Sequence, residues 1–407
     1  MTRRSRVLFS LAALLSAGAV VVALTALSSS SEGPLGTMLD WVAAGVVSIE
    51  HELRTRAAGA GRAKELAWFE PYRASAERLR QPAGILLGVY DSEFLAGAER
   101  LVALERAIDT TVPLIQLYTA WGDGAEHAFP ARAMTRIRTL GSVGVVTWEP
   151  WLAVFDNARH PSLPLREQRD RGGFTAIARG DYDFYIDRWA ADAAAYGHPF
   201  FLRFAHEMND PYRYPWGPQS NSKEEFIAAW RHLVDRFRRA GASNVVWVWS
   251  PHVAYEWWQL YYPGDDVVDW VATGVLNYGP IAQWSRWWTF AEIFGTKYPV
   301  LESFAKPVMI AELGSLRVGG DRADWYRDAL TDLPSRYPAV KSVILFHASD
   351  DQTVTAQKVE WTFRGDDDVA AAVRDAIRSW DPRRVPPATA GPAALTEKTV
   401  VSRLVRR

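Results

Sequence analysis

Eight apolar runs of strand length, separated by segments of helical length, constrain the fold of this chain more than any other feature of its sequence. The intervening segments 181–196 and 223–240 have the length and periodicity of amphipathic helices. Near-continuous apolar strands that alternate with helices indicate a parallel sheet covered on both faces. The apolar runs are Ile85–Tyr90, Val112–Leu117, Val143–Trp148, Phe200–Phe204, Val245–Trp249, Val271–Leu276, Val308–Ala311 and Ser342–Phe346.

The number of these units predicts a closed barrel. Eight strand–helix units over roughly 290 residues fit a (β/α)8 TIM barrel, which typically takes about 250 residues. A doubly wound open sheet is the alternative, but the sequence has neither the GxGxxG nor the Walker pattern that binds the usual ligands of that fold. We therefore predict an α/β chain with a TIM barrel over residues 82–380.

The N-terminus predicts a membrane-inserting segment. Three arginines precede an apolar run from Val7 to Leu27, and basic residues before such a run are typical of segments inserted with the N-terminus inside. The run is long enough to span a bilayer, which favours an uncleaved anchor over a signal peptide. We expect residues 1–33 to be an anchor or signal peptide plus a spacer. The protein would then be extracytoplasmic, either anchored in a bacterial membrane or secreted.

Two further segments flank the predicted barrel. Residues 34–81 are amphipathic, with interruptions at Gly59 and Gly61, and are predicted to form a helical stalk or linker, or a helix packed on the barrel. Residues 381–407 contain four prolines and a basic end. This composition predicts a flexible tail.

The composition excludes several functions and favours one kind of ligand. The net charge of −1 gives no general attraction to nucleic acid. The absence of cysteine excludes disulfides, thiolate metal sites and a cysteine nucleophile. The chain has 19 Trp, 15 Tyr and 17 Phe. Because flat amphipathic rings stack on the C–H faces of sugars, we expect some of them to line a glycan-binding cleft and the others to fill the core.

Two glutamates follow apolar runs at positions that matter for catalysis. Glu207 follows the fourth run and Glu312 the seventh, and barrel active sites lie at the C-terminal ends of the strands. The fourth and seventh strands lie nearly opposite one another across the barrel mouth. Retaining glycoside hydrolysis needs two carboxyl groups about 5–5.5 Å apart, one protonated and one ionised.

Neighbouring residues can separate the charge states of these carboxyls. Arg203 and His206 precede Glu207 and are expected to adjust its charge and orientation. Tyr278 follows the sixth run and is expected to hydrogen-bond the nucleophile.

The residues around both glutamates resemble glycoside hydrolase family 26. The segment Phe201-Leu-Arg-Phe-Ala-His-Glu-Met-Asn209 with Tyr214-Pro-Trp216 is similar to the acid/base region of that family. The segments 308–314, 246–251 and 274–278 resemble its seventh, fifth and sixth strands, and the similarity covers roughly residues 84–361.

The resemblance implies a retaining enzyme without a cofactor that cleaves a β-linked polysaccharide. Most members act on β-1,4-mannan, and some act on mixed-linkage β-glucan or β-1,3-xylan. It implies Glu207 as acid/base and Glu312 as nucleophile. It places His206, Asn209, Trp216 and Tyr278 in the substrate-binding shell, and further candidates for substrate contact are Arg203, Trp121, Trp151, Trp284 and His347.

The chain also departs from the family pattern. Asp210 stands where a glycine is usual, and the loop Pro211–Arg213 differs. The eighth strand lacks the usual tryptophan platform, for which Phe346 or His347 are the substitutes.

Other functions remain open for the same residues. His206-Glu207 begins like a zinc-protease HExxH helix, but position 210 is Asp instead of the second His, so no metal is expected. The altered eighth strand favours an alternative, a membrane-tethered non-catalytic protein that binds glycan, and the predicted anchor with the basic tail favours a role in exopolysaccharide assembly. The presence of both glutamates favours the hydrolase.

Overall fold

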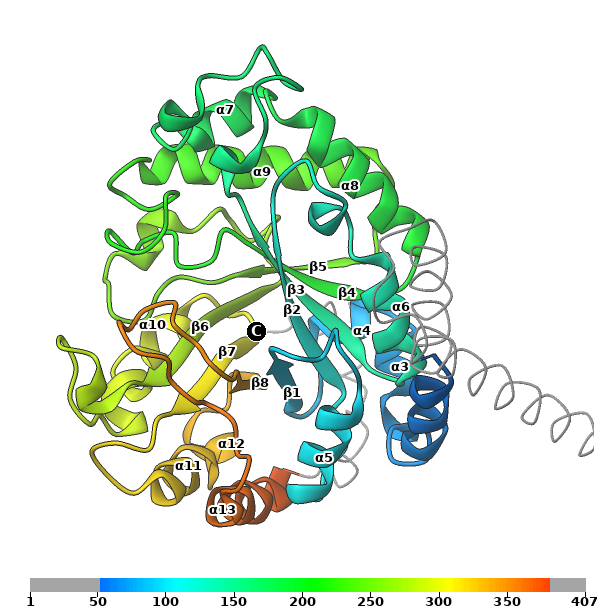
Figure 1. Cartoon of the computed structure of the whole chain (residues 1–407), viewed down its shortest axis with the longest axis vertical. Helices are drawn as coiled ribbons and strands as arrows, with labels where there is room; N and C mark the ends of the chain where they lie inside the picture. Colours follow the sequence, from blue (N-terminus) through cyan, green and yellow to red (C-terminus); the bar gives the residue numbers. More distant parts are fainter. Residues whose placement is uncertain (1–51, 381–407) are drawn as a thin grey trace, which may run out of the picture.

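The computed structural model describes residues 52–380, and its centre is a closed barrel of parallel strands in the order β1 to β8 (Figure 1). Each strand pairs with the next along the chain, and β1 pairs with β8 to close the barrel. All eight predicted strands are present, so the predicted (β/α)8 fold is confirmed. The strands are β1 Leu86–Asp91, β2 Leu114–Ala120, β3 Val143–Glu149, β4 Phe200–Phe204, β5 Val245–Trp249, β6 Trp270–Asn277, β7 Val308–Ser315 and β8 Val340–His347.

Helices surround the barrel (Figure 1). The two helices predicted from periodicity appear as α8 and α9, and α9 begins with a capping box in which Ser222 and Glu225 satisfy each other's backbone N–H groups. The helices are α3 Glu70–Arg73, α4 Ala76–Arg80, α5 Glu99–Ala107, α6 Ala131–Thr139, α7 Gly173–Arg179, α8 Asp183–Tyr196, α9 Lys223–Arg239, α10 Tyr298–Ser303, α11 Arg322–Leu330, α12 Leu333–Arg336 and α13 Asp367–Ile377.

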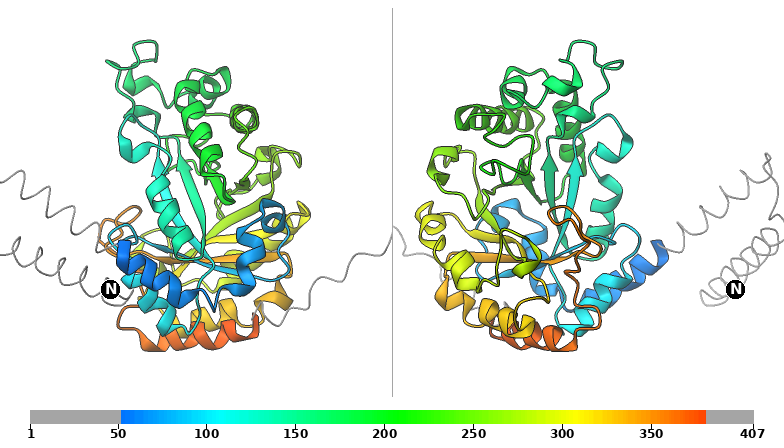
Figure 2. Two further views of the ribbon diagram at one scale, coloured as in Figure 1. Left: turned by 90° about the vertical axis from the view of Figure 1, so that its right-hand side faces the viewer. Right: turned by 60° about the vertical axis from the view of Figure 1, so that its left-hand side comes forward.

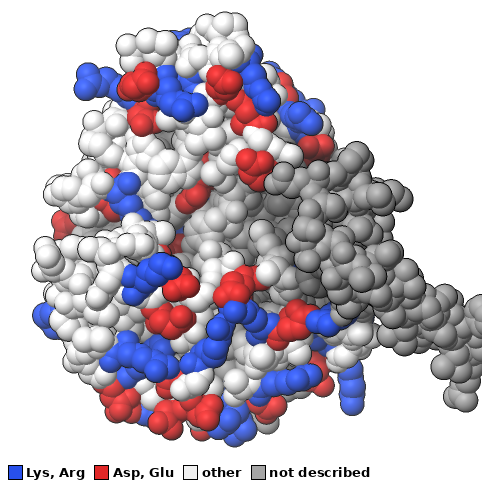
Figure 3. Space-filling model, in the orientation of Figure 1, with Lys and Arg blue, Asp and Glu red and all other residues white. Residues whose placement is uncertain are grey.

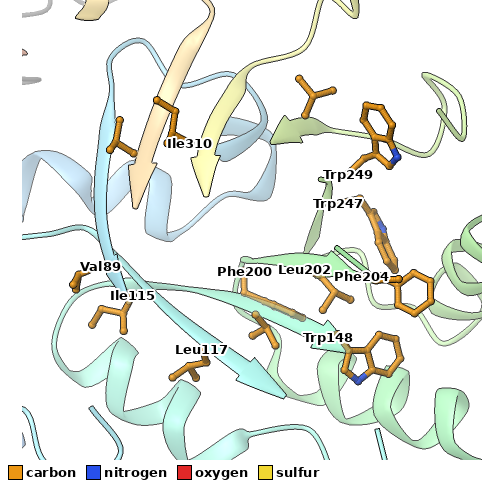
Figure 4. Packing of buried hydrophobic residues seen from close by; sticks show 14 of the residues in the cluster. Val89, Ile115, Leu117, Trp148, Phe200, Leu202, Phe204, Trp247, Trp249 and Ile310 are labelled. Carbon is orange, nitrogen blue, oxygen red and sulfur yellow. The ribbon is translucent and has the colours of Figure 1, made fainter. Parts of the chain in front are cut away.

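The core has two layers. Between the strands and the surrounding helices, large apolar side chains such as Trp148, Phe204 and Trp247 pack together (Figure 4). A second cluster fills the barrel interior. It includes Leu86, Leu114, Val145, Phe201, Val246, Ala272, Met309 and Ile344.

The segment before β1 packs on the barrel and does not form a separate stalk over the described residues (Figure 2). Residues 52–62 are helical. Leu66, Phe69 and Leu79 join the apolar cluster of the barrel interior, and the indole N–H of Trp270 donates to the carbonyl of Leu79 at 2.9 Å. Over residues 52–80 the segment therefore packs on the barrel, and residues 34–51 of the predicted stalk lie outside the described residues.

Gly59 does not interrupt the helix over residues 52–62. A Cβ at this position would collide with the carbonyl of Thr139, so glycine permits a close approach between this helix and the end of α6. Arg62, three residues later, is buried and forms an ion pair with Glu105 at 2.7 Å.

The predicted anchor and tail, residues 1–33 and 381–407, lie outside the described residues. Within residues 52–380, no helix combines the length and apolar character needed to cross a membrane. On the face of the molecule seen in Figure 3, basic and acidic side chains are interspersed around a largely uncharged middle.

One irregularity in the sheet lies beside a predicted catalytic residue. The pairing of β6 with β7 shifts between Thr273 and Gly274, after which Gly274 pairs with Glu312. The pairing of β7 with β8 also shifts between Ile310 and Leu313. Bulges of this kind redirect a side chain next to an active site, and here the redirected residue is Glu312.

Candidate active site

The structure brings Glu207 and Glu312 to the same point in the barrel mouth. Both side chains are buried, with 5% and 4% of their surface exposed. From the position that a Cβ at Gly274 would take, Glu312 Oε2 is 3.6 Å away and Glu207 Oε1 is 3.7 Å away. The two oxygens are therefore at most 7.3 Å apart, the sum of these distances.

Glu207 is held in an unusual backbone conformation. Strand β4 ends at Phe204, and Ala205 and Glu207 then adopt φ angles of 43° and 57°. The Glu207 N–H donates to the carbonyl of Ser250 at 2.7 Å, which fixes the turn to the end of β5. Non-glycine residues with positive φ are uncommon and concentrate at functional sites.

One oxygen of Glu312 is bound by two donors, one on β2 and one on β4. The Tyr118 hydroxyl donates to Glu312 Oε1 at 2.6 Å, and the Arg203 guanidinium contacts the same oxygen at 2.7 Å. Burial, with the charge of Glu312, raises the pKa of Tyr118 well above its usual value, so this hydroxyl keeps its proton and donates. Together these contacts stabilise a negative charge on Glu312.

These contacts correct the roles predicted for Arg203 and Tyr278. Arg203 is 1% exposed and its direct partner is Glu312, although it was predicted to adjust Glu207. The hydrogen bond to Glu312 that was predicted from Tyr278 comes from Tyr118. Tyr118 directly follows the second apolar run, so the strand-end argument applied to that run would have found it.

Glu207 lies in a different environment from Glu312. Burial raises the pKa of Glu207, and the charge of Glu312 raises it further, while the electrostatic effects of His252 and of the Arg213 guanidinium oppose the shift. Arg213 Nη1 lies 3.5 Å from Glu207 Oε2, and His252 Nε2 lies 3.9 Å from Oε1. The net effect favours the protonated form of Glu207 to higher pH than for an ordinary glutamate.

His206 and Trp216 support the loop after β4. His206 is buried, its Nε2 lies 2.9 Å from the Tyr214 hydroxyl, and the Trp216 indole N–H donates to its carbonyl at 2.9 Å. Burial, with the charges of Arg203 and Arg213, lowers the pKa of His206 well below its usual value. His206 is therefore neutral and lies beside Tyr214.

Asn209 joins this loop to the one after β5. Its side-chain amide donates to the carbonyls of His252 and Tyr255, both at 3.2 Å, and its oxygen accepts from the His252 N–H at 2.7 Å. Asn209 thus sets the position of His252 relative to Glu207.

Three predicted aromatic residues lie around the site. The Tyr278 ring meets Trp361 and Trp284 edge-on, at 5.0 and 5.3 Å between centroids. Trp284 is 67% exposed. Trp151 is partly buried and donates to Glu149 Oε2 at 3.1 Å. Burial raises the pKa of Glu149, although this hydrogen bond opposes the shift.

Two of the predicted substrate contacts lie elsewhere. Trp121 is fully buried and packs on Trp148 with ring centroids 4.6 Å apart, so its prediction as a cleft residue is wrong. His347 is buried, and its Nε2 accepts from the Phe363 N–H at 3.0 Å while its Nδ1 lies 3.6 Å from Asp91. Its contacts join β8 to the segment that follows it.

Among the described residues, one group has the spacing of a metal site. Ligand atoms of Glu207, Asp210 and His252 lie within 4.8 Å of one another. However, His252 Nδ1 accepts the Ala254 N–H at 3.0 Å, so in the neutral ring Nε2 carries the proton. This tautomer presents a hydrogen-bond donor toward Glu207, which fits a polar contact better than a metal ligand.

Comparison with known proteins gives concordant results. The family model "Glycosyl hydrolase family 26" matches residues 184–306. Endoglucanase H of Acetivibrio thermocellus is 33% identical over 246 residues, which cover 58% of this chain and 24% of that protein. Beta-1,3-xylanase TXYA of Vibrio sp is 30% identical over 129 residues, which cover 27% of this chain and 25% of that protein. The chain thus spans about a quarter of the length of these curated relatives.

Solved structures share the fold. A family 26 β-mannanase from Bacteroides ovatus matches with a TM-score of 0.54 and 16% identity, covering 76% of this chain and 92% of that one. The Bacillus subtilis mannanase man26 matches with a TM-score of 0.53 and 15% identity, covering 75% and 88%. The family match extends from α8 to α10 and includes Glu207 and Gly274. This match, the alignment with endoglucanase H and the shared barrel together support glycosyl hydrolase family 26 as the family of this chain.

Proposed function

We propose that this chain is a retaining β-glycanase that hydrolyses a β-linked polysaccharide by double displacement. The observation that carries the proposal is the pair of buried carboxyl groups around Gly274, which lie in different electrostatic environments. When its surroundings keep one carboxyl protonated and the other ionised, the first can act as the acid and the second as the nucleophile.

In the first step, the protonated Glu207 donates its proton to the glycosidic oxygen. Glu312 Oε2, the oxygen that faces Gly274, attacks the anomeric carbon as the bond to the leaving sugar breaks. In the second step, Glu207 takes a proton from water, whose oxygen attacks the anomeric carbon and releases Glu312. Each displacement inverts the anomeric centre, so the product retains its configuration.

The residues around each carboxyl support these roles. Tyr118 and Arg203 bind Oε1 of Glu312, which stabilises the ion and leaves Oε2 facing the substrate. Burial raises the pKa of Glu207, as a general acid requires. The upper limit of 7.3 Å between the oxygens admits the roughly 5–5.5 Å needed for retention.

The names of similar proteins support the class of substrate. They include an endoglucanase, β-1,3-xylanases and β-mannanases. We propose a substrate of the β-1,4-mannan or β-glucan type.

The test is a product profile on β-1,4-mannan, mixed-linkage β-glucan and β-1,3-xylan, with the anomeric configuration of the first product followed by NMR. We expect reducing ends from at least one glycan, with retention, and none from Glu312→Ala. An inverted product, or equal activity in the variant, would overturn the mechanism. Glycan binding without turnover by the wild type would support the non-catalytic alternative.

We also propose an extracytoplasmic location that depends on residues 1–33. Expression of the full chain and of residues 34–407 in a bacterial host, followed by fractionation, tests this. Equal recovery of the two forms from the cytoplasm would contradict it.

A further inference from the structure

Arg213, in the loop after β4 that departs from the family pattern, places a positive charge beside the proposed acid. Its Nη1 lies 3.5 Å from Glu207 Oε2, and its guanidinium lies over the ring of Tyr214, 4.9 Å from the ring centroid. On the other side, its Nη2 donates to the hydroxyl of Thr353 at 3.2 Å, and Thr353 donates to Asp351 at 2.8 Å. The guanidinium is thus held between the loop after β4 and the segment after β8.

Most of the hydrogen-bonding capacity of this guanidinium is unused. Arginine has five N–H donors in a planar fork, and the contacts with Glu207 and Thr353 use two of them. Among the partners that residues 52–380 offer, the other three donors have none. The single long contact with Glu207 also differs from the bidentate pair that arginine forms with a carboxylate. Because the side chain is 27% exposed, a ligand can reach the remaining donors.

The charge of Arg213 has no counterion when the site is ready to react. Within the described part of the chain, Glu207 is the one carboxyl in ion-pair contact with Arg213, and a general acid must be protonated before it can donate. Glu312, the other carboxyl of the pair, has its own partner in Arg203. A partly buried cation without a counterion is costly, so the free enzyme retains Arg213 at the expense of stability.

Arg213 also works against the proposed acid. It opposes the rise in the pKa of Glu207 that burial causes, so it favours the form of Glu207 that has no proton to donate. An anion bound to the remaining donors would neutralise this charge and would favour the protonated acid in the complex. A site with an unpaired cation therefore discriminates against neutral ligands and in favour of acidic ones.

We infer that Arg213 binds a carboxylate of the substrate, and that the substrate is a β-linked glycan carrying acidic sugars such as uronic acids. The planar fork of a guanidinium matches the two oxygens of a carboxylate. The inference deepens the proposed function and rests on it, because it takes Glu207 as the acid.

The test compares charged and neutral forms of the same glycan. β-1,4-Mannan and mixed-linkage β-glucan are each used unmodified, with part of their C6 hydroxymethyl groups oxidised to carboxylates, and with those carboxylates converted to methyl esters. The ester keeps the shape of the acidic sugar without its charge. We expect kcat/KM of the wild type for a carboxylated form to exceed that for its ester at least about tenfold, as a hydrogen bond to a charged group implies. The ratio should fall as NaCl is added.

Two substitutions and a control assign this ratio to Arg213. A loss of folding or of the acid lowers kcat/KM for both forms, so the ratio reports the contact itself. Arg213→Gln should make the two values nearly equal, and Arg213→Lys, which keeps the charge without the fork, should retain part of the ratio. Arg317→Gln is the matched control, because Arg317 lies in the loop after β7 and is paired with Asp366 at 3.2 Å. It should leave the ratio unchanged.

Binding without turnover separates this inference from the proposed function. Calorimetry on Glu312→Gln, with and without Arg213→Gln, measures Kd for a carboxylated tetrasaccharide of each glycan and for its methyl ester. We expect the carboxylated form to bind at least about tenfold more tightly than the ester, and only where Arg213 is present.

The outcomes decide each proposal on its own measurement. Equal values for the carboxylated form and the ester would overturn the inference while the hydrolase stands. A preference that survives Arg213→Gln would also overturn it, since another residue would then bind the carboxylate. If the wild type hydrolyses none of the glycans, the proposed function fails, and the Kd values still decide whether Arg213 binds a carboxylate.

Discussion

Tyr118 on β2 donates a hydrogen bond of 2.6 Å to Oε1 of Glu312 on β7. The hydroxyl also accepts from Arg203 at 3.1 Å and from the amide of Gln116 at 3.1 Å. Glu312 is therefore held by a network that crosses the barrel interior. The geometry fixes one carboxylate oxygen and leaves the other facing Gly274.

Replacing Tyr118 by Phe should reduce catalysis more than stability. The substitution keeps the ring and removes a hydrogen bond to a charged group, worth about 1.5–3 kcal/mol. We expect kcat to fall about tenfold or more, while Arg203, which still contacts Oε1 of Glu312, limits the fall in Tm. Tyr185→Phe, which removes a hydrogen bond to the His127 carbonyl in the core, should leave kcat unchanged. Equal kcat values for Tyr118→Phe and the wild type would show that this contact does not orient Glu312.

Replacing Arg203 by Met should destabilise the fold. Arg203 and Glu312 form a buried ion pair, and removing one partner leaves the other charge buried, at a cost of about 3–5 kcal/mol. The double variant Arg203→Met/Glu312→Gln should recover much of this loss. Urea denaturation of the wild type, Arg203→Met, Glu312→Gln and the double variant measures their free energies of unfolding. Arg231→Met, which breaks an exposed pair with Asp266, should cost less than about 1 kcal/mol. Additive losses in the double variant would contradict the pairing.

Stability should depend on pH through Glu207. Burial raises its pKa in the folded protein above the usual value of 4.5, so the folded state binds this proton more tightly than the unfolded chain. Stability from this group is present at low pH and is lost as pH rises through the folded-state pKa. Glu207→Gln should therefore raise Tm relative to the wild type at pH 7, and the difference should shrink toward pH 4.

Glu292 provides a control whose substitution should change Tm at pH 7 in the opposite direction. Its hydrogen bonds to Arg286 and Thr289 lower its pKa to about 2, so its contribution is present at neutral pH and is lost as pH falls toward that value. Glu292→Gln should lower Tm at pH 7, and its difference from the wild type should shrink at low pH. If both variants moved Tm in the same direction at pH 7, the assigned environment of Glu207 would be wrong.

The barrel and its two central glutamates were predictable because both follow from strand order. Apolar runs mark the strands, and the C-terminal ends of the fourth and seventh strands meet at one mouth whatever the details of packing. The partners of each glutamate depend on register and side-chain direction, which the runs do not encode. Arg203 therefore was assigned to its sequence neighbour Glu207, although it reaches Glu312 across the barrel.

The surroundings of Trp121 and of the segment before β1 could likewise not be predicted from the sequence. Trp121 follows a strand end, as catalytic residues do, but its side chain turns outward and packs among Trp148 and Tyr185. The amphipathic pattern before β1 fits a stalk and a packed helix equally well. The burial of Leu66 and Phe69 against the barrel, which only the folded structure reveals, distinguishes them.

Gly274→Ala should block the site without disturbing the fold. The added Cβ would lie 3.6 Å from Glu312 Oε2 and 3.7 Å from Glu207 Oε1, which is ordinary contact, so we expect Tm to change little. The methyl group would occupy the space between the carboxyls where the anomeric carbon must bind, so kcat/KM should fall at least about tenfold. Gly88→Ala on β1 is the contrasting control, because its Cβ would collide with Leu114 and Ile344 and should lower Tm. Full activity in Gly274→Ala would mean that the reacting sugar does not pass between the two glutamates.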